Sequence, residues 1–199
     1  MITLPNYDCG QNILLVASPR SGSHALASML RRYITDYRAE IGLSHKSDTP
    51  WQDLELFCQP HPIPLLAHVV QSRAKIGALN LVDSIKKHSY VIVLRRRDKI
   101  SQFASWIYFR SIKYKYNFDH RGQDYVAPDT YQVTYDDLLY FATNLIVDDY
   151  YDPNLVLYYE DIDFATSSIR KNQYSFDPTL MIRNIDMVKK FFADWPQKK

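Results

Sequence analysis

The sequence predicts an α/β fold, in which a mostly parallel sheet is flanked by helices in three layers. Short apolar runs without polar alternation predict strands that are covered on both faces. Longer segments with helical spacing of apolar residues lie between these runs, and such alternation is typical of right-handed βαβ units. A length of 199 residues fits one domain over positions 1–199. In this fold class ligands bind at the carboxyl ends of the strands, so the functional site is expected there.

Four apolar runs are predicted to be strands. In chain order they are Ile13–Ala17, Leu65–Val70, Val91–Leu94 and Leu155–Tyr159. Four helices are predicted around them, two from apolar residues at positions i, i+3, i+4 and i+7 and one from a capping box. The first helix is predicted to begin near His24 or Ala25, and the second to cover Ala74–Lys87. The third begins near Lys99, after the N-cap residue Asp98, and the fourth follows the capping pair Thr134 and Asp137.

Composition excludes several classes of protein. Lys and Arg total 24 and Asp and Glu total 22, so the net charge of +2 is too small for sequence-independent binding to nucleic acid or anionic membranes. Apolar residues make up 46%, which excludes a largely disordered chain. Cys9 and Cys58 have neither metal-ligand spacing nor a disulfide framework, and no apolar run is long enough for a membrane span. We expect a soluble cytoplasmic protein without a metal site.

The turn after the first strand has the composition of an anion site. Glycine is scarce, with 5 in the chain, and Gly22 lies between Ser21 and Ser23, close behind Arg20. The first turn of the following helix presents backbone N–H groups and the positive end of the helix dipole, so a phosphate or sulfate would find donors from Ser21 to Ala25. A simpler alternative is that Ser23 caps the helix and Gly22 only makes the turn.

Two common nucleotide-binding loops do not match this turn. A Walker A loop has Gly, four further residues and then Gly-Lys-Ser/Thr, but no Lys follows Gly22. A dinucleotide-binding loop needs three glycines in the pattern G-x-G-x-x-G, which the turn lacks. The sequence therefore disfavours both a Walker-type ATP or GTP hydrolase and a Rossmann-type dinucleotide site.

A second cationic segment follows the third predicted strand. Arg95, Arg96 and Arg97 come directly after Val91–Leu94, and Ser105 lies two turns into the next helix. The polar stripe of this helix, which includes Ser105, can face a ligand at the edge of the sheet. Three consecutive arginines are also typical of a solvated charge cluster, which is the alternative interpretation of this segment.

Residues 19–26, Pro-Arg-Ser-Gly-Ser-His-Ala-Leu, resemble the Pro-(Lys/Arg)-Ser-Gly-(Ser/Thr)-Thr-x-Leu loop of sulfotransferases that use 3′-phosphoadenosine 5′-phosphosulfate (PAPS). The resemblance implies a P-loop-type fold and a loop that holds the 5′-phosphosulfate, with Arg20 as the cation beside the transferred sulfonate. His24 departs from the family's usual hydroxyl residue. The residues implied in donor binding at this loop are Arg20, Ser21, Gly22, Ser23, His24 and Ala25.

The segment from Leu94 to Ser105 resembles the 3′-phosphate motif of the same family, an Arg at a strand end followed by a Ser on the next helix. Its form, Leu-Arg-Arg-Arg-Asp-Lys-x-x-Gln-x-x-Ser, is especially similar to carbohydrate sulfotransferases related to trehalose 2-sulfotransferase. Arg95 matches the arginine of this motif by its position at the strand end, and Arg97 matches it by its separation from Ser105. We favour Arg95 as the residue that binds the 3′-phosphate. Weaker similarity extends to residues 155–161 and 182–186.

The resemblance implies transfer of a sulfonate from PAPS to a hydroxyl of a carbohydrate or small molecule, with 3′-phosphoadenosine 5′-phosphate (PAP) as product and no metal. His68 and Glu40 are the candidates for the base that takes the proton of the acceptor. Two other functions stay open. One is a P-loop small-molecule kinase with magnesium held by Asp161 or Asp98, and the other is a non-catalytic nucleotide-binding protein.

Aromatic residues in the middle of the chain have two interpretations. They line a sugar or lipid acceptor site, or they form a core or a partner interface, because aromatic faces stack on ring substrates and equally on one another. These residues are Trp106, Tyr108, Phe109, Tyr114, Tyr116, Phe118 and Tyr125.

Overall fold

The computed structural model of the chain describes residues 2–31, 33–34, 36–37, 57, 59–60, 65–70, 82–116, 130–144, 152–163 and 177–195. The chain divides into two compact units. The first consists of Met1–Arg97 and Asn144–Lys171, and the second of Asp98–Thr143 and Asn172–Lys199. The expectation of one domain over residues 1–199 stays a prediction.

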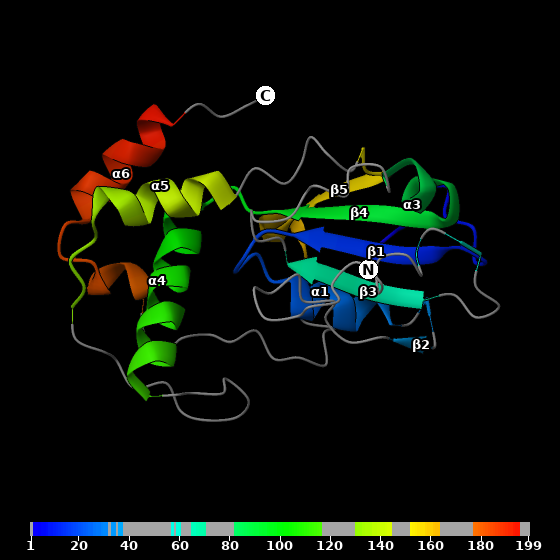
Figure 1. The fold of residues 1–199 in the computed structure, drawn as a ribbon, viewed down its shortest axis with the longest axis horizontal. Helices are drawn as coiled ribbons and strands as arrows, with labels where there is room; N and C mark the ends of the chain where they lie inside the picture. The colour runs from blue at the N-terminus through cyan, green and yellow to red at the C-terminus, as the bar shows by residue number, and fades with distance from the viewer. Residues whose placement is uncertain are drawn as a thin grey trace. The chain divides into compact units, whose positions relative to one another are not determined.

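The first unit is built on a five-stranded sheet with the strand order β2-β3-β1-β4-β5 (Figure 1). All four strand pairings are parallel, which confirms the predicted α/β class with a parallel sheet, while the three-layer, P-loop-type arrangement stays a prediction. The strands are β1 (Asn12–Ala17), β2 (Asp36–Tyr37), β3 (Leu65–Val70), β4 (Ser89–Arg95) and β5 (Leu155–Tyr158). Among its described residues, the helices of this unit are α1 (Ser23–Leu30) and α3 (Val82–His88).

The four predicted strands are confirmed, with small shifts at their ends. β4 extends beyond the predicted run at both ends, while Tyr159 begins the 3-10 helix η3 (Tyr159–Asp161) instead of ending β5. Residues 82–87 of the predicted helix Ala74–Lys87 are helical, and its earlier part lies outside the described residues. Strand β2 is not predictable from the sequence, because two residues are too few to make a pattern.

Every residue of β1 is buried, as expected of a strand that is covered on both faces. Ile13, Leu15 and Ala17 belong to one core cluster with Leu26 and Leu30 of α1. Burying a large apolar side chain of this kind contributes about 1.5–3 kcal/mol to stability. The apolar sequence of β1 therefore holds this strand, and the turn that follows it, in the middle of the sheet.

Side-chain amides fix the strands at their amino ends. The Oδ1 atom of Asn12 accepts a hydrogen bond from the backbone N of Leu65 at 2.9 Å, and the Oδ1 atom of Asn154 accepts one from the backbone N of Val91 at 2.8 Å. Asn12 is buried, and leaving a buried amide unpaired costs about 1–3 kcal/mol. These bonds keep neighbouring strands in register, so their carboxyl ends are aligned at the opposite edge.

The second unit contains α4 (Lys99–Tyr116), α5 (Tyr135–Asn144), the 3-10 helix η5 (Pro178–Met181) and α6 (Ile185–Asp194). The helix starts predicted here are confirmed. The Oδ1 atom of Asp98 accepts a hydrogen bond from the backbone N of Ser101 at 2.9 Å, as an N-cap does. Thr134 and Asp137 form a capping box, in which each backbone N donates to the other's side chain, at 3.1 and 3.2 Å.

Helix α6 is not among the predicted helices, although its residues have a helical pattern of apolar side chains. Val188, Phe191, Phe192 and Trp195 have the spacing i, i+3, i+4 and i+7 that is typical of an amphipathic helix. Val188 and Phe192 are buried, and the rings of Phe191 and Trp195 stack with their centres 5.1 Å apart. Within the described part of the chain, no helix combines the length and the apolar character that crossing a membrane requires.

Candidate functional site

The carboxyl ends of β1 and β4 are neighbours, since Ala17 pairs with Leu94. The order of the strands also changes direction here. After β1 the chain continues to β2 on one side of the sheet, and after β4 it continues to β5 on the other side. Open parallel sheets bind ligands at such a switch point. The turn after β1 and the arginines after β4 therefore lie where a ligand site is expected.

The turn between β1 and α1 has an unusual backbone. Arg20 has a φ of 62° and Gly22 a φ of 89°, so both lie in the left-handed region. Glycine adopts this conformation readily, whereas arginine does so at a cost of about 1–2 kcal/mol. The backbone N and the hydroxyl of Ser21 both donate to the carbonyl oxygen of Ser18, at 3.3 and 2.7 Å. Backbone strain of this kind gathers at functional sites.

Gly22 is the N-cap of α1 and, having no side chain, offers no capping oxygen. Ser23 is the first helical residue, so the alternative in which Ser23 caps the helix is wrong, whereas Gly22 does make the turn. His24 is exposed and Ala25 is half-buried in the same first turn. No acidic residue lies in this turn, so no carboxylate there offsets the positive end of the helix dipole. A bound anion would do so.

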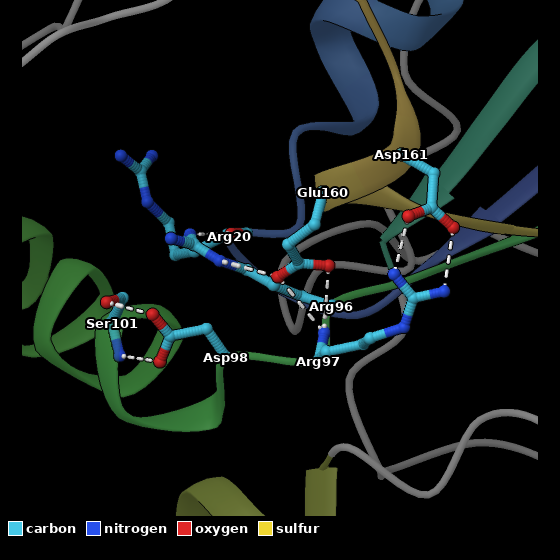
Figure 2. Close-up of polar contacts among 7 residues, drawn as sticks. All are labelled: Arg20, Arg96, Arg97, Asp98, Ser101, Glu160 and Asp161. Atoms are coloured by element: carbon cyan, nitrogen blue, oxygen red, sulfur yellow. Dashed lines mark hydrogen bonds and ion pairs between the residues drawn. The ribbon is translucent and has the colours of Figure 1, made fainter.

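A carboxylate from the end of β5 meets the arginines that follow β4 (Figure 2). Both carboxylate oxygens of Glu160 accept hydrogen bonds from the backbone N of Arg97, at 3.1 and 3.0 Å. The Oε1 atom of Glu160 also lies 3.8 Å from the Nε atom of Arg96. The Nη1 atom of Arg96 in turn donates to the carbonyl oxygen of Arg20 at 3.4 Å. Arg96 therefore connects η3 with the strained turn.

The side chain of Arg97 has different partners. Its guanidinium donates two hydrogen bonds to Asp161, at 2.6 and 2.7 Å, and lies 4.0 Å from the centre of the Tyr158 ring. Hydrogen bonding to Arg97 lowers the pKa of Asp161, and the same hydrogen bonds raise the pKa of Arg97. About half of each side chain is exposed. Arg97 is thus engaged in a surface ion pair and an aromatic contact.

Glu160 is not among the site residues predicted from the sequence. The contact exists because β5 pairs with β4 in parallel, with Tyr158 opposite Arg95. Residues that follow β5 consequently lie beside residues that follow β4. Only the order of the strands brings the two segments together, and no local pattern in the sequence predicts that order.

The other predicted site residues lie in several places. Arg95, favoured for the 3′-phosphate, is the last residue of β4 and lies at the same edge as the turn. Ser105 is buried on α4 in the second unit, and its predicted role in donor binding stays a prediction. His68 lies in β3 beside Leu15 of β1, and its side chain is outside the described part of the structure. Glu40 lies outside the described residues.

Two of the aromatic residues considered for an acceptor site pack within the second unit, Tyr108 in its core and the half-buried Trp106 against neighbouring rings. Tyr108 is fully buried. The ring centre of Trp106 lies 5.4 Å from that of Phe141 and 5.8 Å from that of Tyr140. These contacts favour the core interpretation for Trp106 and Tyr108, while Phe109 is half-buried on α4. The side chains of Tyr114 and Tyr116, and the whole of Phe118 and Tyr125, lie outside the described residues.

Comparison with known proteins gives no match. No protein-family model matches the chain, and neither a curated protein nor a solved structure matches it. A functional assignment therefore depends on the residues of the chain and on the geometry of the turn and the arginines.

Proposed function

We propose that the chain is a sulfotransferase, which moves the sulfonate of PAPS to a hydroxyl group of a carbohydrate or small-molecule acceptor. The observation that carries the proposal is the turn at the carboxyl end of β1. Arg20 and Gly22 have left-handed backbones there, and α1 begins without an acidic first turn. The sequence of the turn also resembles the donor-binding loop of PAPS-dependent sulfotransferases.

The chemical groups of this turn fit a phosphosulfate. They are backbone N–H groups, hydroxyls and a guanidinium, and neither the turn nor the first turn of α1 contains a carboxylate. Donors of this kind at a helix N-terminus bind tetrahedral anions, and charge-assisted hydrogen bonds are about twice as strong as neutral ones. Ser21 donates both its backbone N and its hydroxyl to Ser18 and so shapes the loop, while the direct donors to the 5′-phosphosulfate would be Arg20, Gly22, Ser23, His24 and Ala25.

The contacts of Arg97 count against this residue as the cation that binds the 3′-phosphate. Binding a phosphate through Arg97 would compete with its two hydrogen bonds to Asp161 and its contact with the Tyr158 ring. Arg95 lies at the strand end, where the resemblance to the 3′-phosphate motif expects the cation. The resemblance implies that Ser105 is the hydroxyl partner of that phosphate, and this role stays a prediction.

The reaction needs one group that stabilises negative charge and one that takes a proton. PAPS supplies the sulfonate, and PAP leaves with negative charge on the phosphate oxygen whose bond to sulfur breaks. Arg20 and the backbone N–H groups of the turn stabilise that charge. His68 or Glu40 takes the proton of the acceptor hydroxyl while the acceptor oxygen bonds to sulfur.

The kinase alternative has less support in the same residues. The turn has no Lys after Gly22 to contact the β- and γ-phosphates of a nucleoside triphosphate. The two possible magnesium ligands have other partners. Asp161 accepts two hydrogen bonds from Arg97, and Asp98 caps α4 by accepting one from the backbone N of Ser101. Using either carboxylate for magnesium would compete with these bonds.

Thermal unfolding with ligands tests the donor site. PAP at about 100 times its Kd should stabilise the chain by about 2.7 kcal/mol and raise Tm, and ATP with magnesium should not. We expect Arg20→Ala to remove this shift and Ser105→Ala to reduce it. Lys86→Ala is the matched control, because it also removes one cation but on α3, ahead of the amino end of β4. A shift with magnesium-ATP alone would overturn the proposal in favour of the kinase.

Turnover separates an enzyme from a non-catalytic binding protein. With labelled PAPS and a panel of sugars and small alcohols, we expect the wild-type chain to form a labelled sulfate ester. His68→Ala and Glu40→Ala test the two candidates for the base. The variant that removes the base should lower kcat about a hundredfold, and a residue whose variant has unchanged kcat is not the base. Tight binding of PAP without transfer to any acceptor would favour the non-catalytic alternative.

A further inference from the structure

We infer that Glu160 and Arg96 are positioning residues, which hold the Arg20 turn in the shape that binds the 5′-phosphate of the donor. The inference rests on the proposed function and adds two residues to which the resemblance to sulfotransferases assigns no role. Both act through the backbone of the turn and not by contact with the reacting atoms.

Three groups hold the Arg96 side chain, and Figure 2 shows its contacts with two of them, Glu160 and Arg20. The Oε1 atom of Glu160 lies 3.8 Å from its Nε atom, and the centre of the Tyr159 ring lies 4.8 Å from its guanidinium carbon. Its Nη1 atom donates to the carbonyl oxygen of Arg20 at 3.4 Å. The Arg96 side chain is only 18% exposed, and its buried Nε atom has no hydrogen-bond acceptor among the described residues. A mostly buried cation needs a nearby negative charge, and Glu160 supplies it.

Glu160 is itself fixed by the sheet. Its two oxygens accept hydrogen bonds from the backbone N of Arg97, and η3 follows directly after β5. The pairing of Tyr158 with Arg95 places this segment beside the end of β4. A continuous series of contacts therefore runs from the sheet through Glu160 and Arg96 to the carbonyl of Arg20.

The backbone of Arg20 explains why the turn needs this support. A left-handed arginine persists only where its surroundings hold it in place. The carbonyl of Arg20 and the N–H of Ser21 belong to one peptide plane. Arg96 bonds to the first, and the second donates to the carbonyl of Ser18 at 3.3 Å. Both ends of the plane are thus held, and the neighbouring N–H groups are oriented before an anion binds.

Electrostatic repulsion and positioning predict opposite effects when Glu160 loses its charge. A carboxylate near an anion site repels the anion, so charge alone predicts that Glu160→Gln binds PAP more tightly. Loss of positioning predicts weaker binding, by about tenfold, as for loss of a charge-assisted hydrogen bond. The direction of the change therefore separates the two roles.

The test compares PAP with adenosine 3′-phosphate, which lacks the 5′-phosphate, by isothermal titration calorimetry. We expect the wild-type chain to bind PAP more tightly than adenosine 3′-phosphate. If it binds both ligands equally, or neither of them, the proposed function and this inference are both overturned. We expect Glu160→Gln and Arg96→Gln each to weaken PAP about tenfold and to leave adenosine 3′-phosphate unchanged. Glu160→Asp, which keeps the charge, should give a smaller loss. General damage to the fold would weaken both ligands alike.

Asp152→Asn is the matched control. It also turns an acid into an amide, but ahead of the amino end of β5, where Asp152 pairs with Lys86. It should leave both affinities unchanged. The double variant tests whether Glu160 acts through Arg96. If it does, Glu160→Gln should cause little further loss of PAP affinity in a chain that already carries Arg96→Gln. Three results would overturn the inference without contradicting the PAP site of the wild-type chain. They are tighter binding of PAP by Glu160→Gln, additive effects in the double variant, and an equal loss of affinity for both ligands.

Discussion

Asp161 accepts two hydrogen bonds from the guanidinium of Arg97, at 2.6 and 2.7 Å, beside the ring of Tyr158. Consecutive arginines at the end of β4 therefore have separate carboxylate partners, because Arg96 lies against Glu160 instead. The Asp161 pair lies at the surface, whereas Arg96 reaches the carbonyl of the turn. The two neighbouring ion pairs thus serve different parts of the structure.

Arg97→Gln should raise the pKa of the Asp161 carboxyl toward its ordinary value. Hydrogen bonding to Arg97 lowers this pKa in the folded chain, so the pair stabilises the fold above the ordinary Asp pKa, and this contribution is lost as pH falls through the lowered value. Carbon-detected NMR titration of the Asp161 carboxyl in the wild type and the variant measures the change. Identical titration curves would mean that the pair does not form in solution.

Gly22→Ala should destabilise the chain by about 1 kcal/mol and weaken PAP binding, because a Cβ atom is strained at a φ of 89°. Gly10→Ala is the control. Its added Cβ would lie 3.8 Å from the Oδ1 atom of Asp8, which is ordinary van der Waals contact. Urea unfolding and PAP titration of both variants provide the comparison. Equal stability of the two would contradict the left-handed backbone at Gly22.

Tyr7→Phe should make the fold less sensitive to alkaline pH. Burial of the ring and, to a lesser extent, nearby Cys9 and Asp8 raise the pKa of the Tyr7 hydroxyl from 10.0 to about 12. The hydroxyl donates to the carbonyl oxygen of Gln11 at 3.0 Å. Its contribution to stability is complete below pH 10 and is lost as pH rises toward 12, since the unfolded chain ionises first.

The measurement for Tyr7 is the free energy of unfolding in urea at two pH values, one below 10 and one between 10 and 12. The wild-type chain should lose more stability than Tyr7→Phe between them. The other ionisable groups are common to both chains, so their effects cancel in the comparison. An equal loss would contradict the raised pKa of Tyr7.

Asp98→Ala should destabilise α4 by about 1 kcal/mol, because it removes the side chain that accepts from the backbone N of Ser101. Asp98→Asn keeps an oxygen acceptor at the N-cap and should retain most of the stability. Circular dichroism during urea unfolding measures both variants. A loss in Asp98→Asn as large as that in Asp98→Ala would show that charge, and not capping, is what Asp98 contributes.

Local patterns predict the elements whose residues carry their own signal. The uninterrupted apolar run Ile13–Ala17 predicts β1, because a strand buried on both faces has no polar positions. Asp98 and the pair Thr134 and Asp137 predict the starts of α4 and α5, because capping depends on residues close in sequence. The turn at Gly22 is predictable for the same reason.

The support of the turn is not predictable in this way. Glu160 and Arg96 meet only because β5 lies next to β4, and strand order depends on packing across the whole sheet. The left-handed φ of Arg20 is also invisible in the sequence, since arginine has no preference for that region. Pairs of residues held together by strand order therefore need the structure.

The place of β5 in the chain has a consequence for synthesis on the ribosome. β4 is complete at Arg95, but its neighbour Leu155–Tyr158 follows only after the segment Asp98–Thr143 of the second unit. Until then the nascent chain exposes one side of β4, and an unpaired strand edge is a template for aggregation. Glu160 emerges just after β5. Translation thus completes the β4–β5 pairing and supplies the partner of Arg96 almost at the same moment.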